Sequence, residues 1–176
     1  VERFRIIASA FNELSEFASV LDAGCGLGDL LTAWEAFPKA RLVGVDASPD
    51  AITLGSERLS PNSKIELIES NLIDLAFGNA EFDLVVCLDV LEHVPIFDIS
   101  EAVKQIFRVS NGAVILSINS DNPYKYHPTI LSPETWRTIL GSIDGWTQNH
   151  GFENALTDTV CKSRVEYDFY CYSKVD

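Results

Sequence analysis

The sequence predicts an α/β protein, a three-layer α/β/α sandwich whose doubly wound sheet is mostly parallel and ends in an antiparallel C-terminal strand. Short apolar runs typical of buried strands alternate with segments of helical periodicity up to about residue 145. A glycine cluster follows the first apolar run, and an acidic residue ends the second. Residues 165–172 alternate between apolar and polar side chains, which is typical of an antiparallel strand with one side exposed to water.

The N-terminal half is predicted to contain three helices and three strands. Apolar residues at helical spacing indicate helices over 2–16 and from Leu30 to Phe37. Ser48 before Pro49 predicts the start of a third helix, because serine caps and proline needs no N–H at the first helical position. The strands are expected at 20–21, 42–45 and 65–68.

The C-terminal half repeats the alternation. Continuous apolar runs at 84–88 and 113–118 predict strands covered on both faces. Apolar residues over 99–106 indicate a helix between them, and Ser132 before Pro133 predicts another helix start. Residues 120–133 form the longest loop, and such loops at the carboxyl ends of strands line the ligand crevice of open α/β sheets.

Composition restricts the partners. The chain has 176 residues, enough for one domain spanning 1–176, and a net charge of −13 with no Lys/Arg cluster. This charge argues against nucleic acid and anionic membranes as partners. No signal peptide or long apolar run is visible. Because the chain begins at Val1 and contains no Met, we expect the natural N-terminus to lie upstream.

The cysteines indicate a reducing environment. Cys25, Cys87, Cys161 and Cys171 form no C-x-x-C pair, so no zinc site is expected from them. Reduced thiols in the core favour a cytoplasmic protein.

The strongest motif is the strand, glycine turn and helix start at Val20–Asp29. Gly24, Gly26 and Gly28 let the backbone approach a ligand, and the helix start offers free N–H groups to an anion. Asp46 ends the next strand, where its carboxylate can accept hydrogen bonds from a ribose diol. The alternative interpretation is a tight turn without a ligand.

The spacing G-x-G-x-G differs from the G-x-G-x-x-G of most dinucleotide sites. Here the sequence resembles the class I S-adenosylmethionine (SAM)-dependent methyltransferases. The resemblance covers residues 17–120 and is loose beyond them. Its motifs lie, in order, at 21–28, 42–48, 71–77, 82–94 and 108–113, the last of which resembles the turn before the family's fifth strand.

This resemblance implies that the cofactor is SAM, with S-adenosylhomocysteine (SAH) as product. It implies that backbone groups of the glycine loop and Leu88 meet the methionine part and that Asp22 orients this part. It also implies that Asp46 and Ala47 hold the ribose and one adenine face. Asn71 and Leu72 would hold the adenine edge. Asn71 stands where the family usually has an acid, so it adds a donor and no charge. The loop residues concerned are Gly24, Cys25, Gly26 and Gly28.

Catalytic candidates follow the fourth and fifth strands. His93 and Asp89 come after the fourth strand and are candidate bases, or else a loop-positioning residue and a helix cap. Tyr124, Tyr126 and His127 lie in the 120–133 loop, where they either line an acceptor pocket or pack against one another. Glu92 and His93 alone are too few ligands for a metal, so a metal-independent enzyme is expected.

We expect the acceptor to be a small molecule or a sugar, methylated on O or N. Two alternatives remain open: an NAD-dependent oxidoreductase that shares the glycine turn and Asp46, and a non-catalytic partner subunit with the same fold. The sequence does not fix the oligomeric state.

Overall fold

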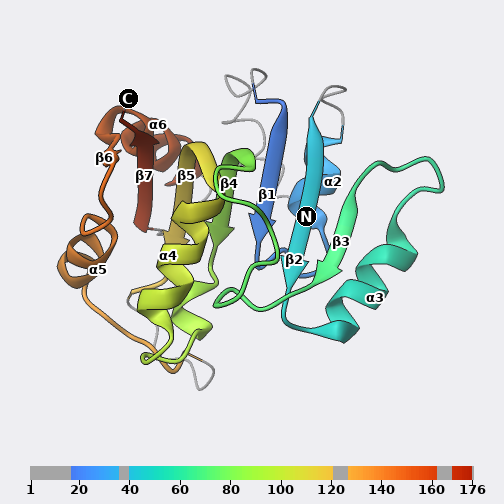
Figure 1. Cartoon of the computed structure of the whole chain (residues 1–176), viewed down its shortest axis with the longest axis horizontal. Coiled ribbons are helices and arrows are strands. Elements are labelled where there is room, and N and C mark those ends of the chain that lie inside the picture. Colours follow the sequence, from blue (N-terminus) through green and yellow to red (C-terminus); the bar gives the residue numbers. More distant parts are fainter. Residues whose placement is uncertain (1–16, 36–39, 121–126, 162–167, 176) are drawn as a thin grey trace.

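The structure is a computed structural model of the chain, and it describes residues 17–35, 40–120, 127–161 and 168–175. Its centre is a seven-stranded sheet with the strand order β3-β2-β1-β4-β5-β7-β6 (Figure 1). The strands are β1 (Ser19–Ala23), β2 (Arg41–Asp46), β3 (Glu66–Glu69), β4 (Phe82–Leu88), β5 (Ser110–Ile118), β6 (Trp146–Gln148) and β7 (Asp168–Lys174).

The first five strands are mutually parallel, and β7 runs antiparallel to both β5 and β6. Helices lie between them in the order α2 (Asp29–Trp34), α3 (Pro49–Arg58), α4 (Ile99–Val109), α5 (Pro133–Leu140) and α6 (His150–Cys161). The predicted mostly parallel sheet with an antiparallel C-terminal strand is confirmed.

Two apolar layers cover the sheet, which confirms the three-layer architecture. On one face, α4 and α5 pack against the sheet through buried residues such as Ile106 and Trp136. On the other face, α2 and α6 pack through Leu31, Trp34 and Leu156. The strand order reverses between β1 and β4, and ligands of open α/β sheets bind beyond the carboxyl ends of the strands at such a point.

The predicted helix starts are present. Ser48 Oγ accepts a hydrogen bond from Ala51 N (3.2 Å), and Ser132 Oγ accepts one from Thr135 N (3.2 Å). Each side chain satisfies an N–H group that the first turn of a helix leaves unpaired. The predicted helix over 2–16 and Phe37 lie outside the described residues.

The last strand differs from its prediction on one point. β7 is antiparallel, as predicted, but its residues Phe169 to Tyr172 are all buried, so it has no wetter side. The reason is its position between β5 and β6, under helices on both faces. Alternation between apolar residues and tyrosines therefore does not predict that one face of the strand is exposed to water.

The turn expected within residues 108–113, before the fifth strand, is also different. β5 already begins at Ser110, and its pairing with β4 shifts by one residue between Phe82 and Leu84. Asn111 and Gly112 therefore lie in a bulge inside the strand, where a Cβ on Gly112 would come within 2.8 Å of Asp83 O.

No helix in the described part of the chain has the length and apolar character needed to cross a bilayer.

Candidate functional site

The glycine loop joins β1 to α2 at the switch point of the sheet. Gly24, Gly26 and Gly28 all have positive φ angles, of 92°, 54° and 75°. A Cβ on Gly24 would come within 2.3 Å of Val90 Cγ2, whereas a Cβ on Gly26 would meet no atom within 4 Å. Packing therefore requires glycine at position 24, while position 26 borders open space that a ligand can enter.

Asp46 connects this loop to the end of β2. Its Oδ2 accepts a hydrogen bond from Gly26 N (2.8 Å), and its Oδ1 accepts one from Ser48 N (2.9 Å). Each carboxylate oxygen has a second lone pair, so Asp46 can position the loop and still accept hydrogen bonds from a diol.

A cavity of about 510 Å³ opens beside the loop and Asp46. Seven of the residues singled out from the sequence line it: Gly24, Asp46, Ala47, Asn71, Leu72, Asp89 and His93. The sequence analysis did not single out its other lining residues, Val45, Ser70, Ile73, Val90, Val94, Pro95 and Asp98. The cavity thus brings together residues that follow β1, β2, β3 and β4.

Asn71 has a fixed orientation at the rim of this cavity. Its Oδ1 accepts a hydrogen bond from Ile73 N (3.2 Å), a local Asx turn. The amide group can therefore be both a donor and an acceptor toward an adenine edge, which a carboxylate cannot.

The other predicted cofactor residues, Asp22, Cys25, Gly26, Gly28 and Leu88, are not among the residues that line the cavity. Asp22 is 3% exposed, and its burial, together with the negative charge of Asp46, raises its pKa to about 7. Burial likewise raises the pKa of the Cys25 thiol. Leu88 is buried at the end of β4, and Gly28 is the residue before α2, packed close to Leu67.

Asp89 follows β4 in a backbone conformation that is uncommon for a residue with a Cβ. Its φ is 56°, its N–H donates to Ser117 O (2.8 Å), and Ser117 Oγ donates to Asp89 Oδ1 (2.7 Å). Such conformations cost about 1–3 kcal/mol and cluster at functional sites. Two bonds to β5 thus hold the Asp89 carboxylate at the cavity wall.

His93 and His127 meet although they are far apart in the sequence. Their rings form an edge-to-face pair with centroids 4.6 Å apart and an interplanar angle of 87°. The segment after His127 is fixed beside the cavity by Thr129, whose N–H donates to Glu92 O (3.2 Å) and whose Oγ1 donates to Val94 O (2.6 Å). Tyr124 and Tyr126 lie outside the described residues.

Glu92 is the acidic residue that sequence reasoning undervalued. Its side chain is 1% exposed, and its Oε1 accepts a hydrogen bond from Asn119 N (3.0 Å). Burial raises the pKa of its carboxyl group. The adjacency of Glu92 and His93 was visible in the sequence, but the contact between His93 and His127 was not.

A sheet of this order, with a glycine loop, an acidic residue at the end of β2 and a cavity at the switch point, defines the class I methyltransferase fold. Residues 20–112 match the model of the methyltransferase domain family. The chain belongs to this family.

Several relatives are named enzymes. The chain is 27% identical over 155 residues to erythromycin 3''-O-methyltransferase of Saccharopolyspora erythraea, covering 82% of this chain and 51% of the relative. It is 34% identical over 135 residues to ubiquinone biosynthesis O-methyltransferase of Alkalilimnicola ehrlichii, covering 73% and 53%. The chain thus spans about half the length of these relatives.

Solved structures share the fold at low identity. Magnesium protoporphyrin IX methyltransferase from Synechocystis PCC 6803, with bound SAH, superposes with a TM-score of 0.71 at 18% identity over 98% of this chain and 83% of that one. The plantazolicin methyltransferase in complex with SAH gives a TM-score of 0.73 at 16% identity over 99% and 84%.

Proposed function

We propose that this chain is a SAM-dependent methyltransferase that transfers a methyl group to an oxygen or nitrogen of a small-molecule or sugar acceptor. The observation that most supports this is the open space at the Cβ position of Gly26, whose N–H donates to Asp46, a residue that lines the cavity. Family membership and the named relatives support the same activity. The buried thiols of Cys25, Cys87 and Cys171 fit a cytoplasmic enzyme.

The residues that line the cavity fit the ribose and adenine of SAM in polarity. Asp46 can accept hydrogen bonds from the ribose diol, and Ala47, Asn71 and Leu72 offer an apolar face and an amide to adenine. Asp22 in β1 and Leu88 at the end of β4 would support the methionine end together with the backbone of the glycine loop. SAM supplies the activated methyl group and its leaving group.

The chain itself must align the acceptor and exclude water, which can lower a barrier by ~7–11 kcal/mol. We infer that the acceptor lies on the side of His93, Asp89 and His127. For a hydroxyl acceptor, His93 or Asp89 can take the proton. A general base contributes roughly 10²–10⁴ in rate, so His93→Ala should lower kcat by about that factor if His93 is the base.

Calorimetry with SAH tests the proposal. The wild-type chain should bind SAH and not NADH, and Asp46→Ala should weaken SAH binding at least tenfold, because a charge-assisted hydrogen bond contributes ~1.5–3 kcal/mol. Binding of NADH in preference to SAH would favour the oxidoreductase alternative. SAH binding without methyl transfer to any acceptor would favour a non-catalytic partner subunit.

A further inference from the structure

Glu92, His93 and His127 form a side-chain cluster next to the cofactor cavity. Each offers one ligand atom, a carboxylate oxygen or an imidazole nitrogen, and these atoms all lie within 4.8 Å of one another. Glu92 and His93 come from the turn after β4, and His127 comes from the segment after β5. His93 also lines the cavity, so the cluster adjoins the space that we assign to the cofactor.

A second observation points into this cluster. Glu92 is 1% exposed, and only its Oε1 has a hydrogen-bond partner among the described residues, the N–H of Asn119. Its Oε2 is buried without any such partner. A buried carboxylate oxygen without a partner is costly, and a cation is one ligand that would satisfy it.

We propose that Glu92, His93 and His127 bind a divalent transition-metal cation at the acceptor side of the cavity. Two imidazoles and one carboxylate are a ligand set of catalytic zinc sites, which leave a further position open. Imidazole ligands favour ions such as Zn²⁺ or Co²⁺, while Mg²⁺ and Ca²⁺ prefer oxygen alone. This proposal departs from the expectation of a metal-independent enzyme.

The geometry requires a modest adjustment. A tetrahedral ion with bonds of about 2.1 Å holds its ligand atoms roughly 3.4 Å apart, so the widest pair would close by about 1.4 Å at most. His93 is exposed and His127 is partly exposed, whereas the buried Glu92 accepts a hydrogen bond from Asn119 N, so the imidazoles rather than the carboxylate would make this adjustment. The two rings pack edge to face, and one nitrogen of each lies within 4.8 Å of the other and of a Glu92 carboxylate oxygen.

The cation deepens the proposed function by defining the acceptor class. Its open position would bind an oxygen of the acceptor and lower the pKa of a hydroxyl bound there. With both histidines bound to the cation, Asp89 in the cavity wall is the group that would take the proton of this hydroxyl. The acceptor would then be a compound with a hydroxyl group, alone or beside a second oxygen. This part rests on the proposed methyl transfer, whereas metal binding itself does not.

Titration of the whole chain with Co²⁺, followed by visible absorption and calorimetry, tests the site without any turnover. One Co²⁺ per chain should bind with the absorption of a nitrogen and oxygen site, and Zn²⁺ should displace it. His127→Ala and Glu92→Gln should each weaken binding at least tenfold. His127→Gln repeats the test if the alanine variant does not fold.

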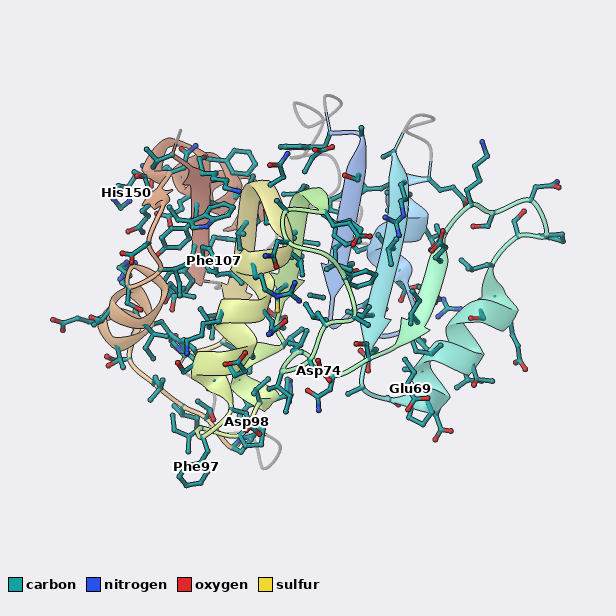
Figure 2. All side chains as sticks on the ribbon, in the orientation of Figure 1. Glu69, Asp74, Phe97, Asp98, Phe107 and His150 are labelled. Atoms are coloured by element: carbon teal, nitrogen blue, oxygen red, sulfur yellow. The ribbon has the colours of Figure 1, made fainter. Side chains whose placement is uncertain are left out.

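His150→Ala is the matched control. His150 is exposed on the far side of the domain and pairs with a single carboxylate, that of Glu153, at 3.0 Å (Figure 2). This variant should bind Co²⁺ like the wild type. SAH affinity, measured on the same samples, reports the proposed function separately, and His127→Ala should retain it within about twofold.

Three results would overturn the proposal. These are no Co²⁺ or Zn²⁺ binding by the wild type, equal affinity in wild type and His127→Ala, and thiolate-to-metal charge-transfer bands, which would assign the ion to cysteine. Metal binding with no SAH binding would support the site and contradict the proposed function.

Discussion

Gly26 is the residue whose backbone and surroundings bear most directly on cofactor binding. Its φ is 54° and a Cβ there would meet no protein atom within 4 Å. Gly26→Val should therefore abolish SAH binding, because the side chain would occupy the space needed by the methionine part, while the domain still folds. Calorimetry with SAH and thermal unfolding measure the two effects.

Gly145→Val is a matched control for that variant. Gly145 also has a positive φ, 80°, and open space around its Cβ position, but it lies between α5 and β6, away from the cavity. Both variants should lose a similar amount of stability to backbone strain. Retained SAH binding in Gly26→Val, or equal loss in both variants, would contradict the role of Gly26.

The buried Asp22 makes stability depend on pH. Its pKa is raised from 3.8 to about 7, so between these values the folded state retains a proton that the unfolded state releases. The stability contributed by this proton is complete below about pH 4 and is lost as the pH rises through 7, by up to about 4 kcal/mol. Asp22→Asn should reduce this fall in the free energy of unfolding between pH 4 and pH 8.

Asp144→Asn serves as the comparison, because Asp144 is exposed in the turn before β6. Urea unfolding at several pH values gives the free energies. If the free energy of unfolding of Asp22→Asn changes with pH in the same way as that of the wild type and Asp144→Asn, Asp22 is not protonated in the folded chain near neutral pH.

At the level of elements, Glu153 connects α6 to the C-terminal strands. Its Oε1 accepts hydrogen bonds from Cys171 N (2.9 Å) and Gln148 Nε2 (2.8 Å), and the residue is 8% exposed. Glu153→Ala should lower the free energy of unfolding by about 1–3 kcal/mol, because the buried N–H of Cys171 loses its acceptor.

Glu134→Ala, in the exposed first turn of α5, should change the free energy of unfolding by no more than about 0.5 kcal/mol. Chemical denaturation of both variants measures the difference. Equal effects would mean that Glu153 does not secure β7 and β6 to α6.

For the whole molecule, SAH should stabilise the folded state by mass action. At one hundred times its dissociation constant, a ligand adds about 2.7 kcal/mol, which in a domain of this size raises Tm by roughly 5–10 °C. At the same concentration, Asp46→Ala should gain only about half of that free energy if its affinity is tenfold weaker. Differential scanning fluorimetry measures the shifts, and NADH should produce none; an equal shift with NADH would contradict the cofactor assignment.

The sequence alone determined the features that depend on local chain chemistry. The glycine turn after Leu21, the caps at Ser48 and Ser132 and the acidic end of β2 each involve neighbouring residues, so their spacing is enough to predict them. The order of these motifs also indicated the family, which the match over residues 20–112 confirms. The order of the motifs also selected Asp46, Ala47, Asn71 and Leu72, which line the cavity.

Only the tertiary structure decided which distant side chains meet and which groups lose water. His127 reaches His93 because β5 runs parallel to β4, which brings the segments after both strands to one edge of the sheet. Glu92 and Asp22 are buried by elements remote in the sequence, and this burial shifts their pKa. β7 is covered on both faces because it lies between β5 and β6 in the sheet. An alternating sequence pattern does not encode this position, because a period of two describes the strand itself and not the elements that pack on it.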